Sequence, residues 1–463
     1  MRLRKRDFDA RINGNLQFEF SDERLTSNAG LELFRQFIKA LELPAALRSV
    51  GHRFDIGGDF TFCKVVLTVV ALLLTGAKRV RHLEFVRTDP LFRRFVGVHR
   101  LPTARSLSRS LSRISWRTWP ELDRMALLVA RSSLKQLDTR RWTLDIDGTI
   151  LTTGLQVERA QRGFNPHRRK NPSYYPILAT LAQTGHVIGH RNRRGNVHDS
   201  HQSAAFLRHS VEQMRGELEL DGTLEVRTDS AFFKRDFLET CDRLKLEYAI
   251  KVPVWPWLNI KGVVKKQPKE SWQWVSQKLQ IQGLFVELPI NAWERTERVA
   301  IYRRRVNHKP TKGRQLELFN PDDGDWEYSV VATNKTLGLA ALWHFQAGRG
   351  VQEKTIAELK SGYAFDSIPT QNYRANTVWQ KLNILTHNLV TTLQLGCRPT
   401  ARPLTHKRTG LFRLSSIATI RFEWLNCAAR LVAPGGKLTL RLPKNSSVEG
   451  RFQRVLQAIA DAA

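Results

Sequence analysis

The spacing of apolar residues divides the chain into a helical first part and a mixed second part. Up to about residue 138, apolar residues recur at helical intervals, as in NAGLELFRQFIKALELPAAL, where Asn28 is the expected cap. From Thr143 onward, short apolar runs such as TLDIDGTIL and TLEVRTDSAFF alternate with polar or glycine-containing turns, which is typical of strands. The helical stretch SAAFLRHSVEQMRGEL lies between these two runs. This alternation predicts an α/β core.

A second change of pattern occurs at residue 246. Between residues 246 and 335, the runs EYAIKVPVW, WQWVSQ, GLFVELPI and WEYSVVATN are β-like, and tryptophans concentrate there. Helical spacing returns in residues 336–400, and residues 401–463 combine a basic loop with one or two strands and a final helix. The sequence therefore predicts a β-rich insertion between two parts of the α/β core.

The charge of the chain narrows the range of partners. Its 463 residues include 74 Lys and Arg against 43 Asp and Glu, a formal net charge of +31 at pH 7. Because this excess is spread along the chain, a compact fold would repel itself unless a polyanion neutralised it, and nucleic acid is the polyanion that we expect. The alternative is a generally basic protein, such as a ribosome-associated one.

Cysteine usage and apolar content exclude several classes of protein. Cys63, Cys241, Cys397 and Cys427 form no CxxC pair, which argues against a zinc knuckle or a disulfide scaffold and favours reduced thiols in a cytosolic protein. The stretch MRLRKRDFDARI leads into no apolar segment typical of a secretory signal. VVLTVVALLLTGA (65–77) is too short to span a bilayer, so we expect a buried helix there and no membrane association.

The stretch LPTARSLSRSLSRISWRTW places three arginines on one predicted helix face. Thr103 can cap this helix, and Arg105, Arg109 and Arg113 follow at intervals of four residues, which align side chains on a helix. A helix with such an arginine stripe can lie in a DNA groove. The alternative is a solvated helix face, which periodicity does not exclude.

The run TLDIDGTIL fits two different chemistries. It matches the first motif of haloacid-dehalogenase-like phosphatases, in which Asp145 would attack phosphorus and Asp147 would protonate the leaving group. That family also needs a later strand ending in paired acids. The pair available here, Asp322 and Asp323, follows Asn-Pro and looks like a turn. The other chemistry is metal-dependent phosphoryl transfer by carboxylates that converge from separate parts of the chain.

Two candidate carboxylates for such a metal site end predicted strands. Asp147 ends the strand in TLDIDGTIL, and Asp229 ends the strand in TLEVRTDS. Mg²⁺ prefers oxygen ligands, and two such ions can activate the attacking oxygen and stabilise the leaving one. A third carboxylate should come from a helix after the insertion.

Helical geometry selects this third carboxylate in QAGRGVQEKTIAELK. At about 100° per residue, Arg349, Glu353 and Lys360 fall within a stripe of ~40°, whereas Glu358 lies about 180° from Arg349. Glu353 therefore shares a face with two cations, which suits a site that holds both a metal and a DNA phosphate. The alternative is a common and weak i, i+4 surface pair of Arg and Glu.

Taken together, these pieces resemble the DDE transposases of bacterial insertion sequences, in the IS-four-like superfamily and most like its thirteen-eighty group. The resemblance covers nearly the whole chain and rests on LDIDGT, GFNPHRRKNPSYYPILA, RNRRGNVHDS, VRTDSAFF and an Arg-x₃-Glu-x₆-Lys pattern ending in AELK. It implies binding of terminal inverted repeats, followed by Mg²⁺-dependent strand cleavage and strand transfer in cut-and-paste transposition. Asp147, Asp229 and Glu353 would be catalytic and would hold two Mg²⁺ ions, for which Mn²⁺ can substitute. Arg349 and Lys360 would contact the DNA backbone.

The resemblance also implies a fold, partners and a location. The fold is α/β, an RNase H-like core with a β-rich insertion, preceded by an α-helical N-terminal DNA-binding region. The partners are double-stranded DNA at transposon ends and target, and a second copy of the chain in a homodimer. No nucleotide cofactor is expected, and the location is the bacterial cytoplasm, at the nucleoid. The expected domains are the helical region 1–138, the first core part 139–245, the insertion 246–335, the second core part 336–400 and the basic C-terminal region 401–463.

Two further points concern aromatic residues. In hairpin-forming relatives, an aromatic residue of the insertion stacks on a flipped base. Candidates for this stacking, with filling of a small β core as the alternative, are Trp255, Trp257, Trp272 and Trp274. The signature tyrosine three residues before the arginine is replaced here by Gln346, a departure that leaves the role of that tyrosine open.

A DNA-binding relative without activity is the remaining alternative to a transposase and a phosphatase.

Overall fold

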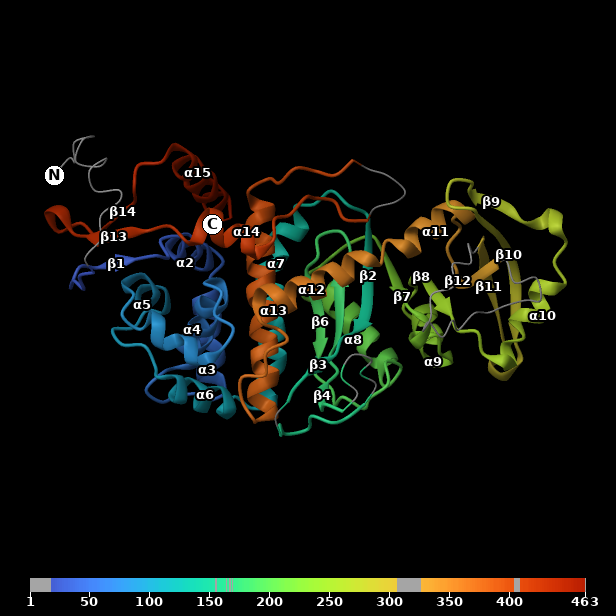
Figure 1. Ribbon diagram of the computed structural model, residues 1–463, viewed down its shortest axis with the longest axis horizontal. Helices are drawn as coiled ribbons and strands as arrows, with labels where there is room; N and C mark the ends of the chain where they lie inside the picture. The colour runs from blue at the N-terminus through green and yellow to red at the C-terminus, as the bar shows by residue number, and fades with distance from the viewer. Residues whose placement is uncertain are drawn as a thin grey trace.

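The computed structural model describes most of the chain and shows an elongated molecule. The described residues are 18–154, 156–163, 165, 168, 170–305, 326–403 and 409–462. The N-terminal helices lie at one end, a sheet with its covering helices lies in the middle, and the strands of the predicted insertion lie at the other end (Figure 1).

Helices form the described N-terminal part, as predicted. They are α2 (Leu31–Ala40), α3 (Leu43–Arg53), α4 (Phe62–Leu74), α5 (Pro90–Val96), α6 (Ala104–Arg113) and α7 (Trp119–Lys135). Thr103 caps α6 as predicted, because its side chain accepts a hydrogen bond from the Ser106 backbone N–H. The predicted cap at Asn28 is wrong, since α2 begins at Leu31 and no side chain caps it.

A nine-stranded sheet forms the centre of the molecule and extends into its far end. Its strands, in the order β6-β5-β2-β7-β8-β12-β11-β10-β9, are β2 (Arg141–Gly148), β5 (Ile177–Leu181), β6 (Val187–Arg191), β7 (Thr223–Thr228), β8 (Glu247–Val252), β9 (Gln273–Ser276), β10 (Ile281–Ile290), β11 (Arg295–Arg305) and β12 (Trp326–Thr333). Strand β7 runs parallel to both β2 and β8, whereas the other neighbours in this sheet are antiparallel. The carboxyl ends of β2, β7 and β8 therefore lie at one edge.

The predicted insertion continues the core sheet instead of forming a sheet of its own. Strand β8, which falls within the predicted insertion, pairs in parallel with β7. Strand β12 then pairs antiparallel with β8, for example Val330 opposite Val252. The short helix α10 (Ile260–Lys265) also lies in this region, so the region is not purely β. Backbone hydrogen bonds thus connect the strands of the insertion directly to the strand that precedes Asp229.

Helices cover both faces of the sheet. They are α8 (Ser203–Gly216), α9 (Arg235–Arg243), α11 (Leu339–Ala347), α12 (Gly350–Tyr363) and α13 (Tyr373–Gly396). Helices α8 and α9 pack with Leu144 and Ile146 of β2, whereas α11 packs on the face that carries Ala249 and Val331. Helices α11 and α12 run one after the other from the insertion toward the middle of the molecule (Figure 1).

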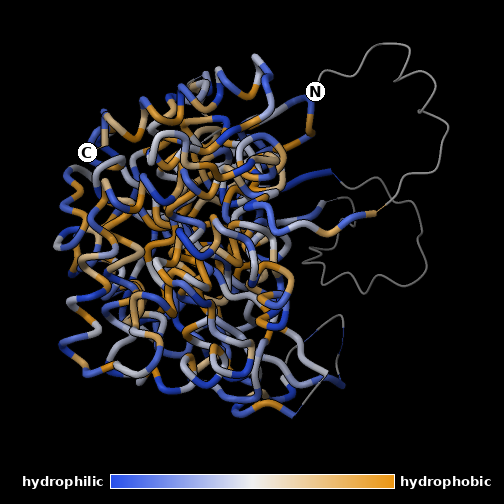
Figure 2. The backbone as a smooth tube through the Cα atoms, turned by 90° about the vertical axis from the view of Figure 1, so that its left-hand side faces the viewer, coloured by the Kyte–Doolittle hydropathy of each residue, from blue (hydrophilic) through white to orange (hydrophobic). Residues whose placement is uncertain are grey.

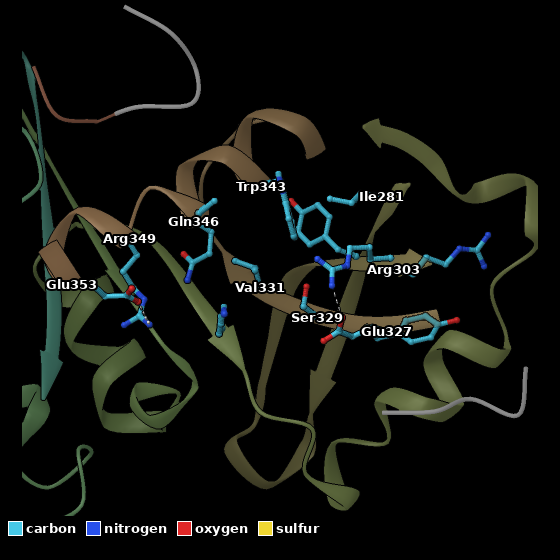
Figure 3. A pocket seen from close by; sticks show the side chains of 15 residues that line it. Ile281, Arg303, Glu327, Ser329, Val331, Trp343, Gln346, Arg349 and Glu353 are labelled. Atoms are coloured by element: carbon cyan, nitrogen blue, oxygen red, sulfur yellow. Dashed lines mark hydrogen bonds and ion pairs between the residues drawn. The ribbon is translucent and has the colours of Figure 1, made fainter. Parts of the chain in front are cut away.

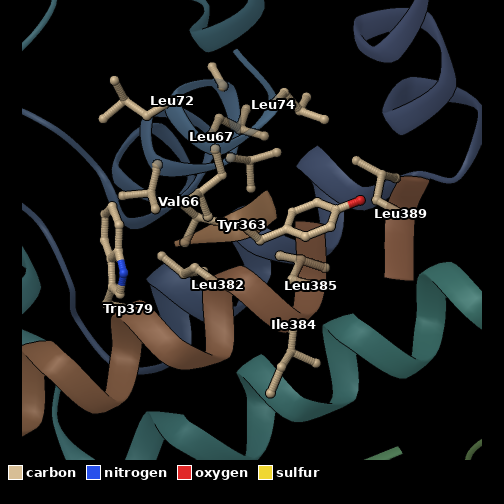
Figure 4. Close-up of a cluster of buried hydrophobic side chains, with 14 of the residues drawn as sticks. Val66, Leu67, Leu72, Leu74, Tyr363, Trp379, Leu382, Ile384, Leu385 and Leu389 are labelled. Carbon is tan, nitrogen blue, oxygen red and sulfur yellow. The ribbon is translucent and has the colours of Figure 1, made fainter. Parts of the chain in front are cut away.

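Helix α13 joins the N-terminal helices to the sheet. It is buried along most of its length, and its Trp379, Leu382 and Leu385 lie in the same cluster as Val66 and Leu67 of α4 (Figure 4). The predicted buried helix at 65–77 is confirmed by α4. Apolar residues concentrate in the interior of the molecule (Figure 2). No helix within the described residues is long and apolar enough to cross a membrane.

The described C-terminal residues return to the N-terminal end of the molecule. Their elements are α14 (Ile417–Ile420), β13 (Ala429–Val432), β14 (Thr439–Arg441) and α15 (Ser446–Asp461). Strand β13 pairs with both β14 and β1 (Leu25–Thr26), and α15 packs on α2.

A separate two-stranded ribbon, β3 (Leu151–Thr152) with β4 (Ser173–Tyr174), follows the end of β2.

Candidate active site

Two of the predicted carboxylates lie at the shared edge where β2 and β7 end. Asp147 is the penultimate residue of β2, and one of its oxygens accepts a hydrogen bond from the Gly148 backbone N–H at 2.9 Å. Asp229 directly follows β7 and accepts a hydrogen bond from the Ala231 backbone N–H at 3.0 Å. Because β2 and β7 are parallel neighbours, their carboxyl ends bring Asp147 and Asp229 together.

The third predicted carboxylate approaches this edge from α12. Arg349, which directly precedes α12, donates a hydrogen bond from Nη1 to Oδ2 of Asp147 at 2.9 Å. The Nη2 atom of Arg349 lies 3.9 Å from Oε1 of Glu353, whose side chain is 68% exposed. Glu358 points elsewhere, since its Oε1 accepts a hydrogen bond from the Ile417 backbone N–H at 2.6 Å. The predicted difference in facing between Glu353 and Glu358 is therefore confirmed.

The electrostatics of the two aspartates show that they share one environment. Burial, together with the charges of Asp229 and Asp199, raises the pKa of Asp147 to about 6, although Arg349 opposes this rise. Burial also raises the pKa of Asp229, and Arg349 again opposes it. The guanidinium of Arg349 thus acts on both aspartates at once.

The donor set fits a hard divalent cation, although the ligands do not converge on one point. Asp147, Asp229 and Glu353 offer only carboxylate oxygens, which Mg²⁺ prefers. Within the described residues, no three His, Cys, Asp or Glu side chains are close enough to hold one ion together. Arg349 lies between Asp147 and Glu353 and supplies the positive charge there.

Asp145 has a structural role. It is fully buried, and both of its oxygens accept hydrogen bonds from Arg227, at 2.7 Å from Nε and 2.8 Å from Nη2. Arg227 also donates from Nη1 to the Phe345 backbone carbonyl oxygen at 2.6 Å, near the junction of α11 and α12. In this arrangement Asp145 cannot reach a phosphate, which argues against the phosphatase interpretation of TLDIDGTIL.

Lys360 and Gln346 contact the backbone near the two aspartates. Lys360 donates from Nζ to the Ile150 carbonyl oxygen at 3.0 Å, just beyond β2, and burial lowers its pKa. Gln346, which replaces the signature tyrosine, is buried and donates from Nε2 to the Thr228 carbonyl oxygen at 3.0 Å. Gln346 therefore anchors α11 to the residue before Asp229.

Sequence reasoning missed a fourth carboxylate, Asp199. It accepts hydrogen bonds from the Tyr175 hydroxyl at 2.6 Å and from Nη2 of Arg193 at 3.2 Å. A side chain at Gly148 would meet Asp199 Oδ1 at 2.3 Å, so glycine permits this close approach. Asp199 lies within the quoted stretch RNRRGNVHDS, but only the fold brings it beside Asp147.

The three arginines that are predicted to contact DNA lie on α6, among the N-terminal helices and far from the carboxylates. Arg105, Arg109 and Arg113 are all exposed, while Leu107 and Leu111 on the opposite face are buried. The stripe therefore faces solvent and is available to a partner.

The four candidate tryptophans have different surroundings. Trp257 and Trp274 are each 49% exposed. Trp255 stacks on Trp257, with ring centroids 5.4 Å apart. Trp272 is buried, and the guanidinium of Arg303 lies 4.1 Å from its ring centroid.

Parts of two features named in the sequence analysis lie outside the described residues. They are Phe164, Pro166, His167 and Arg169 of GFNPHRRKNPSYYPILA, and the acid pair Asp322 and Asp323.

Comparison with known proteins identifies a family and similar solved structures. The family described as "Transposase DDE domain group 1" matches residues 8–463. No curated protein matches the chain significantly. A cryo-EM structure of the piggyBac transposase synaptic complex with hairpin DNA is similar, at 13% sequence identity, a TM-score of 0.40, and coverage of 80% of this chain and 77% of the other.

Proposed function

Because the chain belongs to the DDE transposase family, we propose that it cuts the ends of its own mobile element and joins them to a target DNA. The observation that carries this proposal is the position of the Arg349 guanidinium, which lies 2.9 Å from Asp147 and 3.9 Å from Glu353 and whose charge also acts on Asp229. Three carboxylates beside a cation match the needs of phosphoryl transfer, in which negative charge must be bound and an oxygen activated.

Each residue has a proposed role. Asp147, Asp229 and Glu353 would hold two Mg²⁺ ions, which activate the attacking oxygen and stabilise the leaving oxygen when bound. Arg349 would move from the carboxylates to a DNA phosphate near the cut. Lys360, which is hydrogen-bonded to the loop after β2, would also contact the DNA backbone. The attacking group is water in the first step and the freed 3′-OH in the second.

The DNA-binding surfaces and the assembly are part of the same proposal. The exposed stripe of Arg105, Arg109 and Arg113 would contact the backbone of the terminal inverted repeat. A homodimer would hold two element ends together.

Cleavage of end-labelled DNA tests this function. The DNA carries the sequences that flank the gene, and a shuffled sequence of equal length is the control. We expect nicking at a fixed position with Mg²⁺ or Mn²⁺ and none with EDTA. Binding without any cleavage under all metal conditions would favour a DNA-binding relative without activity. Hydrolysis of a small phosphate ester that is lost in Asp145→Ala would favour the phosphatase.

Metal binding is expected to weaken as the pH falls through about 6. The raised pKa of Asp147, about 6, means that this carboxyl is mostly protonated below that pH. Since a carboxylate must lose its proton to bind a metal, apparent Mn²⁺ affinity should drop about tenfold per pH unit below the pKa. Mn²⁺ titrations followed by electron paramagnetic resonance between about pH 5 and 8 measure this effect. An affinity that stays constant over this range would contradict the assignment of Asp147 as a ligand.

Among the four tryptophans, we expect Trp257 to stack on an unpaired base. Its half-exposed ring lies on Trp255 beside Lys234, whose Nζ is 5.2 Å from the Trp255 ring centroid. Trp257→Ala should weaken binding of DNA with unpaired nucleotides at the cut by roughly 1–3 kcal/mol, and binding of intact duplex much less. Trp274→Ala is the matched control, since Trp274 has the same exposure but lies on the edge strand β9. Equal losses in both variants would contradict this choice.

A further inference from the structure

A groove leads away from the carboxylates along the sheet of the insertion. It has a volume of about 440 Å³, and Arg349 and Glu353 stand at one end of it. Trp343 and Gln346 of α11 form one wall, and Ser329 of β12 faces them (Figure 3). Because the groove begins at the proposed cleavage site, a DNA strand that leaves the cut in this direction would lie along it.

Lys251 is the cation best placed to act in this groove. Ile250 of β8 pairs with Thr228 of the neighbouring strand β7. Lys251, the next residue of β8, therefore lies beside Asp229 at the same edge of the sheet. Its side chain is exposed and lines the groove with Arg349 and Glu353. Its charge also acts on Asp229, where it opposes the rise in pKa that burial causes. No hydrogen bond or ion pair joins the Lys251 side chain to another residue that the structure describes.

Other cations nearby are already paired. Lys335 is buried, with Nζ 2.6 Å from Oε1 of Glu225, and has a structural role. Arg304, at the far end of the groove, lies 3.3 Å from Glu327. The guanidinium of Arg303 is sandwiched between Trp272 and Trp326, at 4.1 and 4.5 Å from their ring centroids. Lys251 therefore differs from these three in having a free ammonium group beside the carboxylates.

We propose that this groove binds the sugar–phosphate backbone of the DNA strand next to the cut, and that Lys251 contacts one of its phosphates. This inference rests on the proposed function, because it needs a cleaved DNA strand at the carboxylates. The ammonium group of a lysine is a compact positive charge on a flexible stem and can contact one phosphate. Such a contact positions the strand and reads no sequence. Lys251 is thus a positioning residue for cleavage.

Neutral phosphates test this contact directly. DNA is prepared with a single methylphosphonate at each of the phosphates nearest the cut, one position per molecule. Binding and cleavage are measured for the wild type, for Lys251→Ala, and for Lys278→Ala, a control lysine that is exposed in the turn between β9 and β10 and lies outside the groove. Thermal unfolding of each variant confirms that it is folded.

The expected result is a coupling between Lys251 and one phosphate. In the wild type, one methylphosphonate position should weaken binding about five- to tenfold, and Lys251→Ala should weaken binding of ordinary DNA by a similar factor. At that position the variant should lose nothing further, and the slope of log affinity against log salt should fall by about one. Lys278→Ala should behave as the wild type.

Two results would overturn the inference in different ways. If the wild type binds and cuts DNA but Lys251→Ala matches Lys278→Ala at every position, the groove is not a strand-binding site, and the proposed function stands. If the wild type neither binds nor cuts DNA, the proposed function fails, and the inference fails with it.

Discussion

Replacing Asp147 by asparagine is expected to lower the rate of strand cleavage by about a thousandfold or more while leaving DNA binding largely intact. Asparagine keeps the shape of the side chain and the acceptor for the Gly148 N–H, but it removes the charge that a metal needs. Loss of several kcal/mol of transition-state stabilisation corresponds to a factor of this size. The rate is measured in single-turnover cleavage of end-labelled DNA with Mg²⁺.

The helix α12 supplies the matched pair of variants for this experiment. Glu353→Gln should lower the cleavage rate as much as Asp147→Asn does. Glu358→Gln should cut at the wild-type rate, because glutamine can still accept the hydrogen bond from the Ile417 N–H. If Glu353→Gln cuts as fast as Glu358→Gln, the third ligand lies elsewhere in the chain. If Asp147→Asn cuts at the wild-type rate, the assignment of these carboxylates as the cleavage site is wrong.

Replacing Arg227 by methionine is expected to lower the free energy of unfolding by about 3–5 kcal/mol, the largest stability effect that we foresee for one residue. The substitution leaves the Asp145 carboxylate buried without its partner, and an uncompensated buried charge carries a cost of this order. Thermal unfolding followed by calorimetry measures the loss.

Two further variants distinguish the loss of the Asp145–Arg227 ion pair from a general effect of removing an arginine. Arg208→Met breaks an exposed pair with Glu212, at 3.9 Å, and should cost less than about 1 kcal/mol. The double variant Asp145→Leu with Arg227→Met should regain part of the loss, because no unpaired charge remains. A double variant that is less stable than Arg227→Met alone would contradict this account.

The parts of the site that local pattern determines were predictable from the sequence. Apolar runs ending in Asp147 and Asp229 indicated strand ends, because burial of a strand depends on consecutive side chains. The choice of Glu353 over Glu358 followed from helical angles alone, and the two side chains do point to different neighbours. The strands β6-β5-β2-β7-β8 form the RNase H-like core expected for the family.

Contacts between distant parts of the chain were not predictable in the same way. Arg349 and Asp147 are separated by 202 positions, and Asp145 and Arg227 by 82. Nothing in the local sequence around Asp145 distinguishes a buried ion pair from a nucleophile, because both need a carboxylate after an apolar run. Strand β8 could not be assigned to the core either, since a short apolar run is consistent both with a strand of a parallel sheet and with a buried strand of a separate β unit.

The small sheet that joins β1 to β13 constrains the order in which this protein folds. Leu25 and Thr26 pair with Arg430 and Ala429, about 400 residues later, and Gly30 lies so close to Trp424 that an added Cβ would be 2.0 Å from its carbonyl oxygen. During synthesis the N-terminal helices therefore leave the ribosome long before their final neighbours exist. Contacts of such sequence separation form late because the loop must close first. The surface of the N-terminal helices that contacts the C-terminal residues would thus stay exposed to solvent until translation has nearly ended.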